Sequence, residues 1–195
     1  MFTGIIETIG KINTIENHGT NIDFTIQSPI SKEMKIDQSV AHNGVCLTVV
    51  DIEEDWHKVT AVEETLLKSN LKELKVHSIV NLERCMIANG RFDGHIVQGH
   101  VDQTAVCTKR EEKEGSWLFD FEYDNSVGNV TVEKGSICID GISLTCFNSA
   151  DGKFSVTIIP YTMDHTTFKS LQPGHTVNLE FDIIGKYVSK LLNKK

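Results

Sequence analysis

The chain carries the same pattern twice, and this repeat limits its possible folds more than any other feature. Residues 39–48 read SVAHNGVCLT, and residues 136–145 read SICIDGISLT, 97 positions further on. At the same spacing HKVTAV (57–62) matches FSVTII (154–159), and residues 64–83 match residues 161–180, both ending in VNLE. A constant register over this length indicates that one structural unit has been duplicated.

The start of each unit is less sharply marked. IETIGKI near the amino terminus corresponds to VDQTAVC near residue 104, at an offset of 96 or 97. We therefore expect two domains, residues 1–96 and residues 97–195.

Short runs rich in Val, Ile, Thr and Phe alternate with Gly, Asn and Asp within each unit. Apolar and polar residues that alternate between turn residues predict short β-strands. Five or six such strands in a unit of fewer than 100 residues favour a barrel, because closure removes the exposed edges of a small sheet. The predicted fold class is all-β, with two tandem, similar six-stranded barrels.

Two further local patterns refine this prediction. The dipeptides Asn43-Gly44 and Asp140-Gly141 are typical of tight hairpin turns, so Cys46 and Ser143 are expected just beyond them. A short helix is expected in each unit, over residues 65–74 and 162–171, capped by a serine or threonine.

The carboxy-terminal stretch DIIGKYVSKLLNKK has a helical pattern. It brings Ile184, Val188, Leu191 and Leu192 to one face, with lysines elsewhere. We expect a helix over about 184–194, and its apolar face favours oligomerisation.

Charge and composition exclude several classes of protein. The formal net charge is −8 and there is no basic stripe, which argues against nucleic acid as a partner. No apolar run approaches the ~18 residues of a membrane span, and the first residues do not read as a signal peptide, so a cytoplasmic protein is expected. The five cysteines contain no CxxC motif, so we expect thiols, and neither they nor the histidines have metal-site spacing.

Over essentially its whole length the sequence resembles the riboflavin synthase family. The resemblance rests on eight motifs in order: MFTGI, SVAHNGVCLTV, ETL followed by SNL, VNLER, GHIVQGHVD, KGSICIDGISLT, IPYT followed by TTF, and DIIGKYVSKLL. It implies two Greek-key barrels and a homotrimer joined through the carboxy-terminal helix. It also implies an active site between the first barrel of one subunit and the second barrel of its neighbour, and possible association with lumazine synthase.

The enzymes of this family transfer a four-carbon unit between two molecules of 6,7-dimethyl-8-ribityllumazine. The products are riboflavin and 5-amino-6-ribitylamino-2,4-pyrimidinedione, and the resemblance implies no metal or organic cofactor. A reaction between two identical molecules needs two pockets for the same heterocycle, which a duplicated barrel can supply. Either barrel can hold the donor.

Four residues are candidates for catalysis, each with a simpler alternative. His100 can move a methyl proton or be an ordinary junction histidine; Cys46 can act as a nucleophile or be a small core residue. Ser143, which matches Cys46 in the second unit, can hydrogen-bond the heterocycle. Asp182 is implicated by the resemblance and also suits the N-cap of the last helix. His95 and His42 are weaker candidates.

The resemblance also implies a larger set of substrate-binding residues. They are Gly4, Ile5, Ile6, Ser39, Cys46, Leu47, Thr48, Thr60, Ala61, Val62, Glu63, Glu64 and Thr65. The set continues with Gly99, His100, Val101, Lys134, Ser143, Leu144, Thr145, Ile158, Ile159, Pro160, Tyr161, Thr162 and Met163. Tyr161 departs from the family, which commonly has Glu or His there, so the polar contact of that position is in doubt.

Two other functions compete with the enzyme. Lumazine and flavin antenna proteins are similar to the family and bind a chromophore without converting it, but they lack the histidine that this chain keeps as His100. A generic flavin-reductase-like or oligonucleotide-binding barrel is the other alternative; the charge argues against nucleic acid, and there is no phosphate-binding glycine loop.

Overall fold

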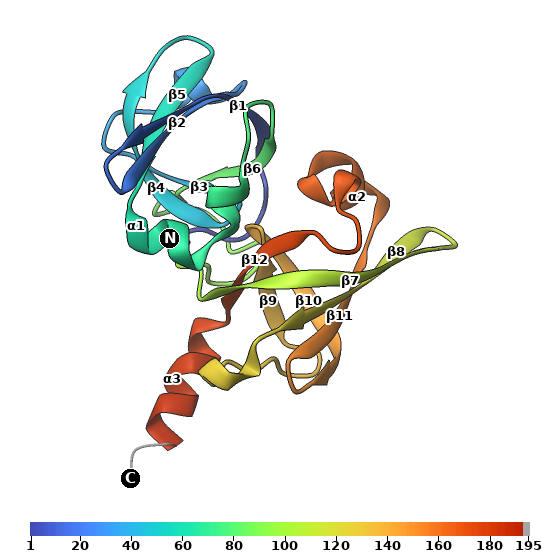
Figure 1. Cartoon of the computed structure of the whole chain (residues 1–195). Coiled ribbons are helices and arrows are strands. Elements are labelled where there is room, and N and C mark those ends of the chain that lie inside the picture. The colour runs from blue at the N-terminus through green and yellow to red at the C-terminus, as the bar shows by residue number, and fades with distance from the viewer. Residues whose placement is uncertain (193–195) are drawn as a thin grey trace.

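The computed structural model describes residues 1–192 and contains two closed antiparallel barrels followed by a helix (Figure 1). Barrel 1 comprises β1 (Thr8–His18), β2 (Asn21–Gln27), β3 (Ser39–His42), β4 (Val45–Ile52), β5 (Trp56–Ala61) and β6 (Ile79–Arg84). Its strand order is β1-β2-β5-β4-β3-β6. The consecutive strands β2 and β3 are therefore not neighbours in the barrel, and neither are β5 and β6, which confirms the Greek-key prediction.

Barrel 2 repeats this arrangement. It comprises β7 (Gln103–Lys113), β8 (Ser116–Tyr123), β9 (Ser136–Ile139), β10 (Ile142–Ala150), β11 (Lys153–Ile158) and β12 (Thr176–Phe181), with the order β10-β11-β8-β7-β12-β9. The first strand pairs Thr8 with Leu82 in barrel 1, and Gln103 with Leu179 in barrel 2. The first strands are therefore offset by 95 residues, so the predicted offset of 96 or 97 is wrong for them.

The predicted single helix in each unit is two short helices with a break. α1 (Glu63–Lys68) is followed by the 3₁₀ helix η2 (Asn70–Glu73), and α2 (Pro160–His165) by η4 (Thr167–Ser170). Ser69 and Thr166 are extended at the breaks, and each side-chain oxygen donates to the carbonyl four residues earlier and accepts the amide two residues later. These local bonds compete with the continuing helix, so both residues cap the 3₁₀ helix instead.

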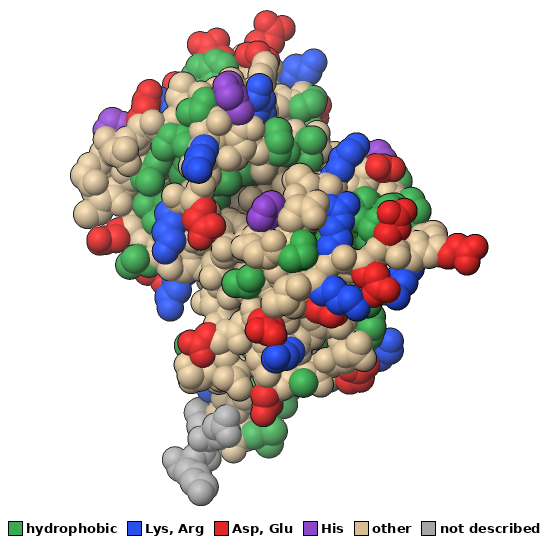
Figure 2. Space-filling view, turned by 45° about the vertical axis from the view of Figure 1, so that its right-hand side comes forward, with side chains coloured by type: hydrophobic (Ala, Val, Ile, Leu, Met, Phe, Trp, Pro, Cys, Tyr) green, Lys and Arg blue, Asp and Glu red, His purple; other side chains and the backbone are tan. Residues whose placement is uncertain are grey.

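The last helix, α3 (Ile183–Leu192), projects from barrel 2, and none of its residues is buried within the chain (Figure 1). The predicted residues 193 and 194 of this helix lie outside the described part. No helix among the described residues is both long and apolar enough to cross a membrane. Charges of both signs are scattered over the face in Figure 2, without a basic stripe.

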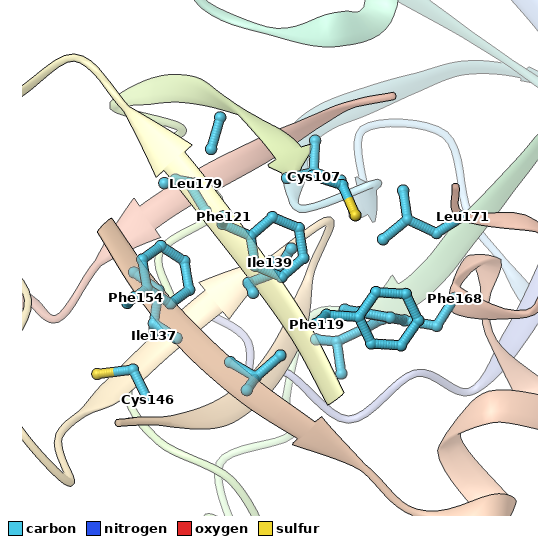
Figure 3. Packing of buried hydrophobic residues seen from close by; sticks show 14 of the residues in the cluster. Cys107, Phe119, Phe121, Ile137, Ile139, Cys146, Phe154, Phe168, Leu171 and Leu179 are labelled. Atoms are coloured by element: carbon cyan, nitrogen blue, oxygen red, sulfur yellow. The ribbon is translucent and has the colours of Figure 1, made fainter. Parts of the chain in front are cut away.

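Each barrel has its own core. Barrel 2 is filled by Phe119, Phe121, Phe154 and Phe168; the rings of Phe121 and Phe154 stack 5.4 Å apart (Figure 3). The core of barrel 1 is mainly aliphatic, with residues such as Ile26, Val59 and Leu82. Burying these side chains is the main source of stability for such small barrels.

The two barrels meet through the predicted hairpin turns. Asn43, Gly44, Asp140 and Gly141 all have positive φ angles, as a two-residue hairpin turn of this type requires. A Cβ on Gly44 would lie 2.6 Å from the amide nitrogen of Gly141, so the turns are in direct contact and glycine is needed there.

Both asparagines of the VNLE repeats cross this junction. Asn81 donates its side-chain amide to the carbonyl of Asp140 (2.9 Å), and Asn178 donates its own to the carbonyl of Asn43 (2.8 Å). These bonds are equivalent in the repeat, so the barrels are related by an approximate twofold axis. Buried side-chain amides that are hydrogen-bonded across the junction in this way fix the relative orientation of the barrels.

Candidate functional site

Two equivalent segments, one preceding each barrel, bridge the junction. Leading segment 1 (residues 2–7) precedes β1, and leading segment 2 (residues 97–102) precedes β7; Phe2 and Val97 pair with each other through backbone hydrogen bonds of 2.7 and 3.1 Å. Gly4 accepts the amide of Ser143 through its carbonyl (2.7 Å), and Gly99 accepts the amide of Cys46 (2.8 Å). Each segment therefore contacts the barrel that it does not lead into.

A cavity of about 570 Å³ lies on barrel 2 beside leading segment 1. Eight predicted residues line it: Ile5, Lys134, Ser143, Leu144, Thr145, Ile158, Ile159 and Thr162. Five further lining residues were not predicted: Asp93, Gly94, Ser136, Phe147 and Thr157. The mixture of hydroxyl groups, one lysine and apolar walls suits a flat heterocycle with a polar edge and a hydroxylated chain.

The hydroxyl of Ser143, which lines this cavity, is hydrogen-bonded to a histidine beside it. His95 Nδ1 lies 2.6 Å from Ser143 Oγ. Burial lowers the pKa of His95, and the nearby carboxylate of Asp182 opposes this. Asp182 also accepts the amide of Ile184 (2.9 Å), which confirms its predicted capping position at α3. Ser143 and His95 therefore form a hydrogen-bonded pair, with the Asp182 carboxylate close enough to favour the charged form of the imidazole.

The matching surface of barrel 1 surrounds Cys46. The thiol of Cys46 is partly exposed, and Gly99 is packed so closely that a Cβ on it would lie 2.6 Å from Cys46 Cβ. His100 follows Gly99 and is exposed, while Val101 packs against the core of barrel 1. Leading segment 2 therefore brings His100 and Cys46 to the same end of barrel 1, at the place that Ile5 and Ser143 occupy on barrel 2.

The other predicted residues of barrel 1 fall into three groups. Ser39 and Thr48 pair across β3 and β4, and Thr60 donates its hydroxyl to Asp23 (2.7 Å). Val62, Glu63 and Glu64 are exposed at the start of α1, and Thr65 is partly exposed. The side chains of Leu47 and Ala61 lie in the core, so only their backbone is available to a ligand.

Five other predicted residues lie close to barrel 2 but do not line the cavity. The carbonyl of Gly4 accepts the amide of Ser143, and Ile6 packs against the core of barrel 2. The Met163 side chain is buried in that core. Pro160 and Tyr161 are exposed at the start of α2, where the Tyr161 ring stacks on His165 at 4.2 Å.

His42 is not at either site. It is buried in barrel 1, with Nε2 2.9 Å from Nε2 of His57, whose Nδ1 lies 2.9 Å from Ser31 Oγ. Burial lowers the pKa of His57 to about 4 and the pKa of His42 well below its ordinary value, so both are neutral. This hydrogen-bonded histidine pair is part of the interior of barrel 1.

One group among residues 1–192 has the composition of a metal site. Glu16, His18 and Asp23 on the β1–β2 hairpin bring three ligand atoms within 4.8 Å of one another. Glu16 already pairs with Lys58 (3.3 Å) and Asp23 with Thr60 (2.7 Å), and protein contacts of this kind explain the exposed cluster.

Comparison with known proteins identifies the class of this fold. The model of the lumazine binding domain family matches residues 3–85 and again residues 98–182. The structure of LumP complexed with 6,7-dimethyl-8-(1'-D-ribityl) lumazine superimposes with a TM-score of 0.84 at 22% identity, and covers 93% of this chain and 99% of that one. The chain therefore belongs to the double-barrel proteins built from two lumazine binding domains.

Closer relatives define the family. The riboflavin synthase of Bacillus subtilis (strain 168) is 43% identical over 195 residues, covering 100% of this chain and 91% of the relative. That of Actinobacillus pleuropneumoniae is 43% identical over 196 residues, with the same coverage. The chain is a member of the riboflavin synthase family, and this membership supports an enzyme of the transferase class over a non-catalytic binder.

Proposed function

We propose that the chain converts two molecules of 6,7-dimethyl-8-ribityllumazine into riboflavin and 5-amino-6-ribitylamino-2,4-pyrimidinedione, and that each barrel holds one of them. The observation that carries this proposal is the approximate twofold relation of the two sites, with Cys46 on barrel 1 where barrel 2 has Ser143. Two similar sites can bind one heterocycle twice, and their differences allow identical molecules to take opposite roles.

On barrel 2 different cavity residues bind different parts of the substrate. Thr145 and Ser143 face a pyrimidinedione edge, whose carbonyl and NH groups pair with hydroxyls and strand amides. Lys134 stands at the rim for the ribityl chain, with its ammonium 5.0 Å from the centre of the Phe147 ring. His95 holds the Ser143 hydroxyl so that Ser143 can donate to or accept from the ring.

On barrel 1 the groups near the ring are more reactive. His100 removes and returns a methyl proton, the step that makes one lumazine a carbon nucleophile, because an imidazole nitrogen can both accept and donate a proton. Cys46 contacts the ring as a polarisable nucleophile, and Thr48 binds its polar edge. Holding two stacked reactants in the reactive pose can itself lower the barrier by roughly 7–11 kcal/mol.

A complete active site needs the binding site of a barrel 1 to face the binding site of a barrel 2. The exposed apolar residues of α3, which include Ile184, Val188 and Leu191, support a homotrimer in which barrel 1 of one subunit meets barrel 2 of the next. The proposed enzyme works in the cytoplasm, can associate with lumazine synthase and uses no cofactor.

The proposal is tested by mixing the purified protein with 6,7-dimethyl-8-ribityllumazine and no other reactant, and following the products by absorbance and chromatography. Riboflavin and the pyrimidinedione are expected in equal amounts. Tight binding with no riboflavin formed would reject the enzyme and favour a chromophore-binding protein.

A further inference from the structure

The glutamate that ends each VNLE repeat is buried among backbone amides of a leading segment. Glu180 on β12 is 3% exposed; its Oε1 accepts the amide of Gln98 (2.6 Å), and its Oε2 accepts the amides of Gly99 (2.8 Å) and His100 (2.9 Å). Three consecutive amides are thus fixed by one carboxylate. Hydrogen bonds to an ionised acceptor are roughly twice as strong as neutral ones.

Glu83 makes the equivalent contacts with the other segment. It is 5% exposed and accepts the amide of Thr3 (2.7 Å), the hydroxyl of Thr3 (2.8 Å) and the amide of Gly4 (3.0 Å). Burial raises the pKa of both carboxyl groups, and their hydrogen bonds to the segments oppose this. The two glutamates therefore have matched environments, but Glu83 holds the segment of Ile5 and Glu180 holds the segment of His100.

The bonds of Glu180 determine where His100 lies relative to barrel 1. Gly99 is fixed from both sides, because its amide donates to Glu180 while its carbonyl accepts the amide of Cys46 (2.8 Å). With φ at +80° and Cys46 in contact, this backbone has little freedom to shift. His100 is attached directly to it, and its own amide is the third donor to Glu180.

We propose that Glu180 is a positioning residue for His100: barrel 2 holds, through this carboxylate, the histidine that works in the site of barrel 1. The inference rests on the role given to His100 under Proposed function. It gives a function to Glu180, the last residue of the second VNLE sequence. The repetition of VNLE singles this residue out but does not say what it does. The two sites of one chain are then mechanically linked, since β12 of barrel 2 sets the geometry at barrel 1.

The test is a double-mutant cycle between Glu180→Gln and His100→Ala, read as kcat for the conversion of 6,7-dimethyl-8-ribityllumazine. Glutamine keeps the volume but has one acceptor oxygen, and it turns an NH₂ group toward amide donors. A displacement of about 1 Å can cost on the order of 100-fold, so we expect E180Q to lower kcat roughly 10–100-fold with a small change in KM. In the H100A background, E180Q should change kcat less than about twofold.

Glu83→Gln is the matched control, because it removes the same kind of contact and should have a comparable cost in stability. Its effect on kcat should be the same factor in the presence and absence of His100. If E180Q lowered kcat by the same factor in the presence and in the absence of His100, the positioning role of Glu180 would be overturned and the role of His100 would stand. An H100A chain with undiminished turnover would instead reject the role of His100, and the inference with it.

If Glu180→Gln does not fold, Glu180→Asp provides the second variant, since it keeps the charge and shortens the reach. Amide hydrogen exchange of residues 98–100 is then measured alongside kcat. We expect faster exchange and lower kcat together in E180D. Full activity with these amides unprotected would contradict the inference.

Discussion

Replacement of Asp140 by asparagine should change the pH dependence of stability. Asp140 lies buried at the junction of the barrels, and its Oδ1 accepts the amide of Asn178 (2.8 Å) and the side-chain amide of Asn70 (3.2 Å). Burial raises its pKa to about 7, and these donors oppose the effect. In the other barrel the equivalent residue is Asn43, which cannot ionise.

The sign and size of the effect follow from proton linkage. Because the folded-state pKa is the higher one, the folded chain keeps this proton after the unfolded chain has lost it, so stability falls as pH rises from about 4 to about 7. With a pKa of about 7 when folded and about 3.9 when unfolded, the carboxylate costs roughly 3 kcal/mol more at about pH 8 than at about pH 5. Asparagine keeps the acceptor oxygen and has no such cost.

The assay is urea unfolding followed by tryptophan fluorescence at one protein concentration. We expect the free energy of unfolding of Asp140→Asn, relative to the unmodified chain, to rise by roughly 3 kcal/mol between about pH 5 and about pH 8. The control, Asn43→Asp, places a carboxyl at the equivalent position and should lose stability over the same interval. A difference between D140N and the unmodified chain that is constant with pH would refute this reasoning.

Three other substitutions test the site and the assembly. His100→Ala should lower kcat on the order of 100-fold, the usual contribution of a general base, while the Kd for the lumazine measured by fluorescence stays nearly unchanged; an unchanged kcat would exclude His100 from the reaction. Gly99→Ala should lower kcat at least about tenfold, because its Cβ would meet Cys46, whereas Gly19→Ala, with a positive φ but open space around it, should retain full turnover. Leu191→Glu should convert the proposed trimer into monomers in analytical ultracentrifugation, since it places a charge on the apolar face of α3; a trimer that persists would place the contact elsewhere.

The repeat allowed much of the fold to be predicted from the sequence. Strand alternation and the NG and DG turns specify two barrels, because these signals are local. The break at Ser69 was missed, since a helical pattern of apolar residues does not reveal a side chain that bonds its own backbone. The crossing of the leading segments was also missed, because long-range packing leaves no periodic signal.

At the site, too, residues with a local sequence signal could be predicted, and residues that depend on long-range contacts could not. Ser136 and Thr157 could have been found, because they lie 97 residues after Ser39 and Thr60, which were already candidates. His95 was set aside because spacing alone does not show that it meets Ser143, 48 residues away in the chain. Glu180 carried a signal, the second VNLE, but its three amide partners can be seen only in the folded chain.

The most direct test of the account is the number of ligand molecules bound by one chain. Equilibrium dialysis of the His100→Ala protein with 6,7-dimethyl-8-ribityllumazine measures binding with little conversion. Two molecules per chain, one for each barrel, are predicted, and a Ser143→Ala substitution should weaken only one of them. Saturation at one molecule per chain would contradict the claim that the duplicated barrels provide two sites for the same heterocycle.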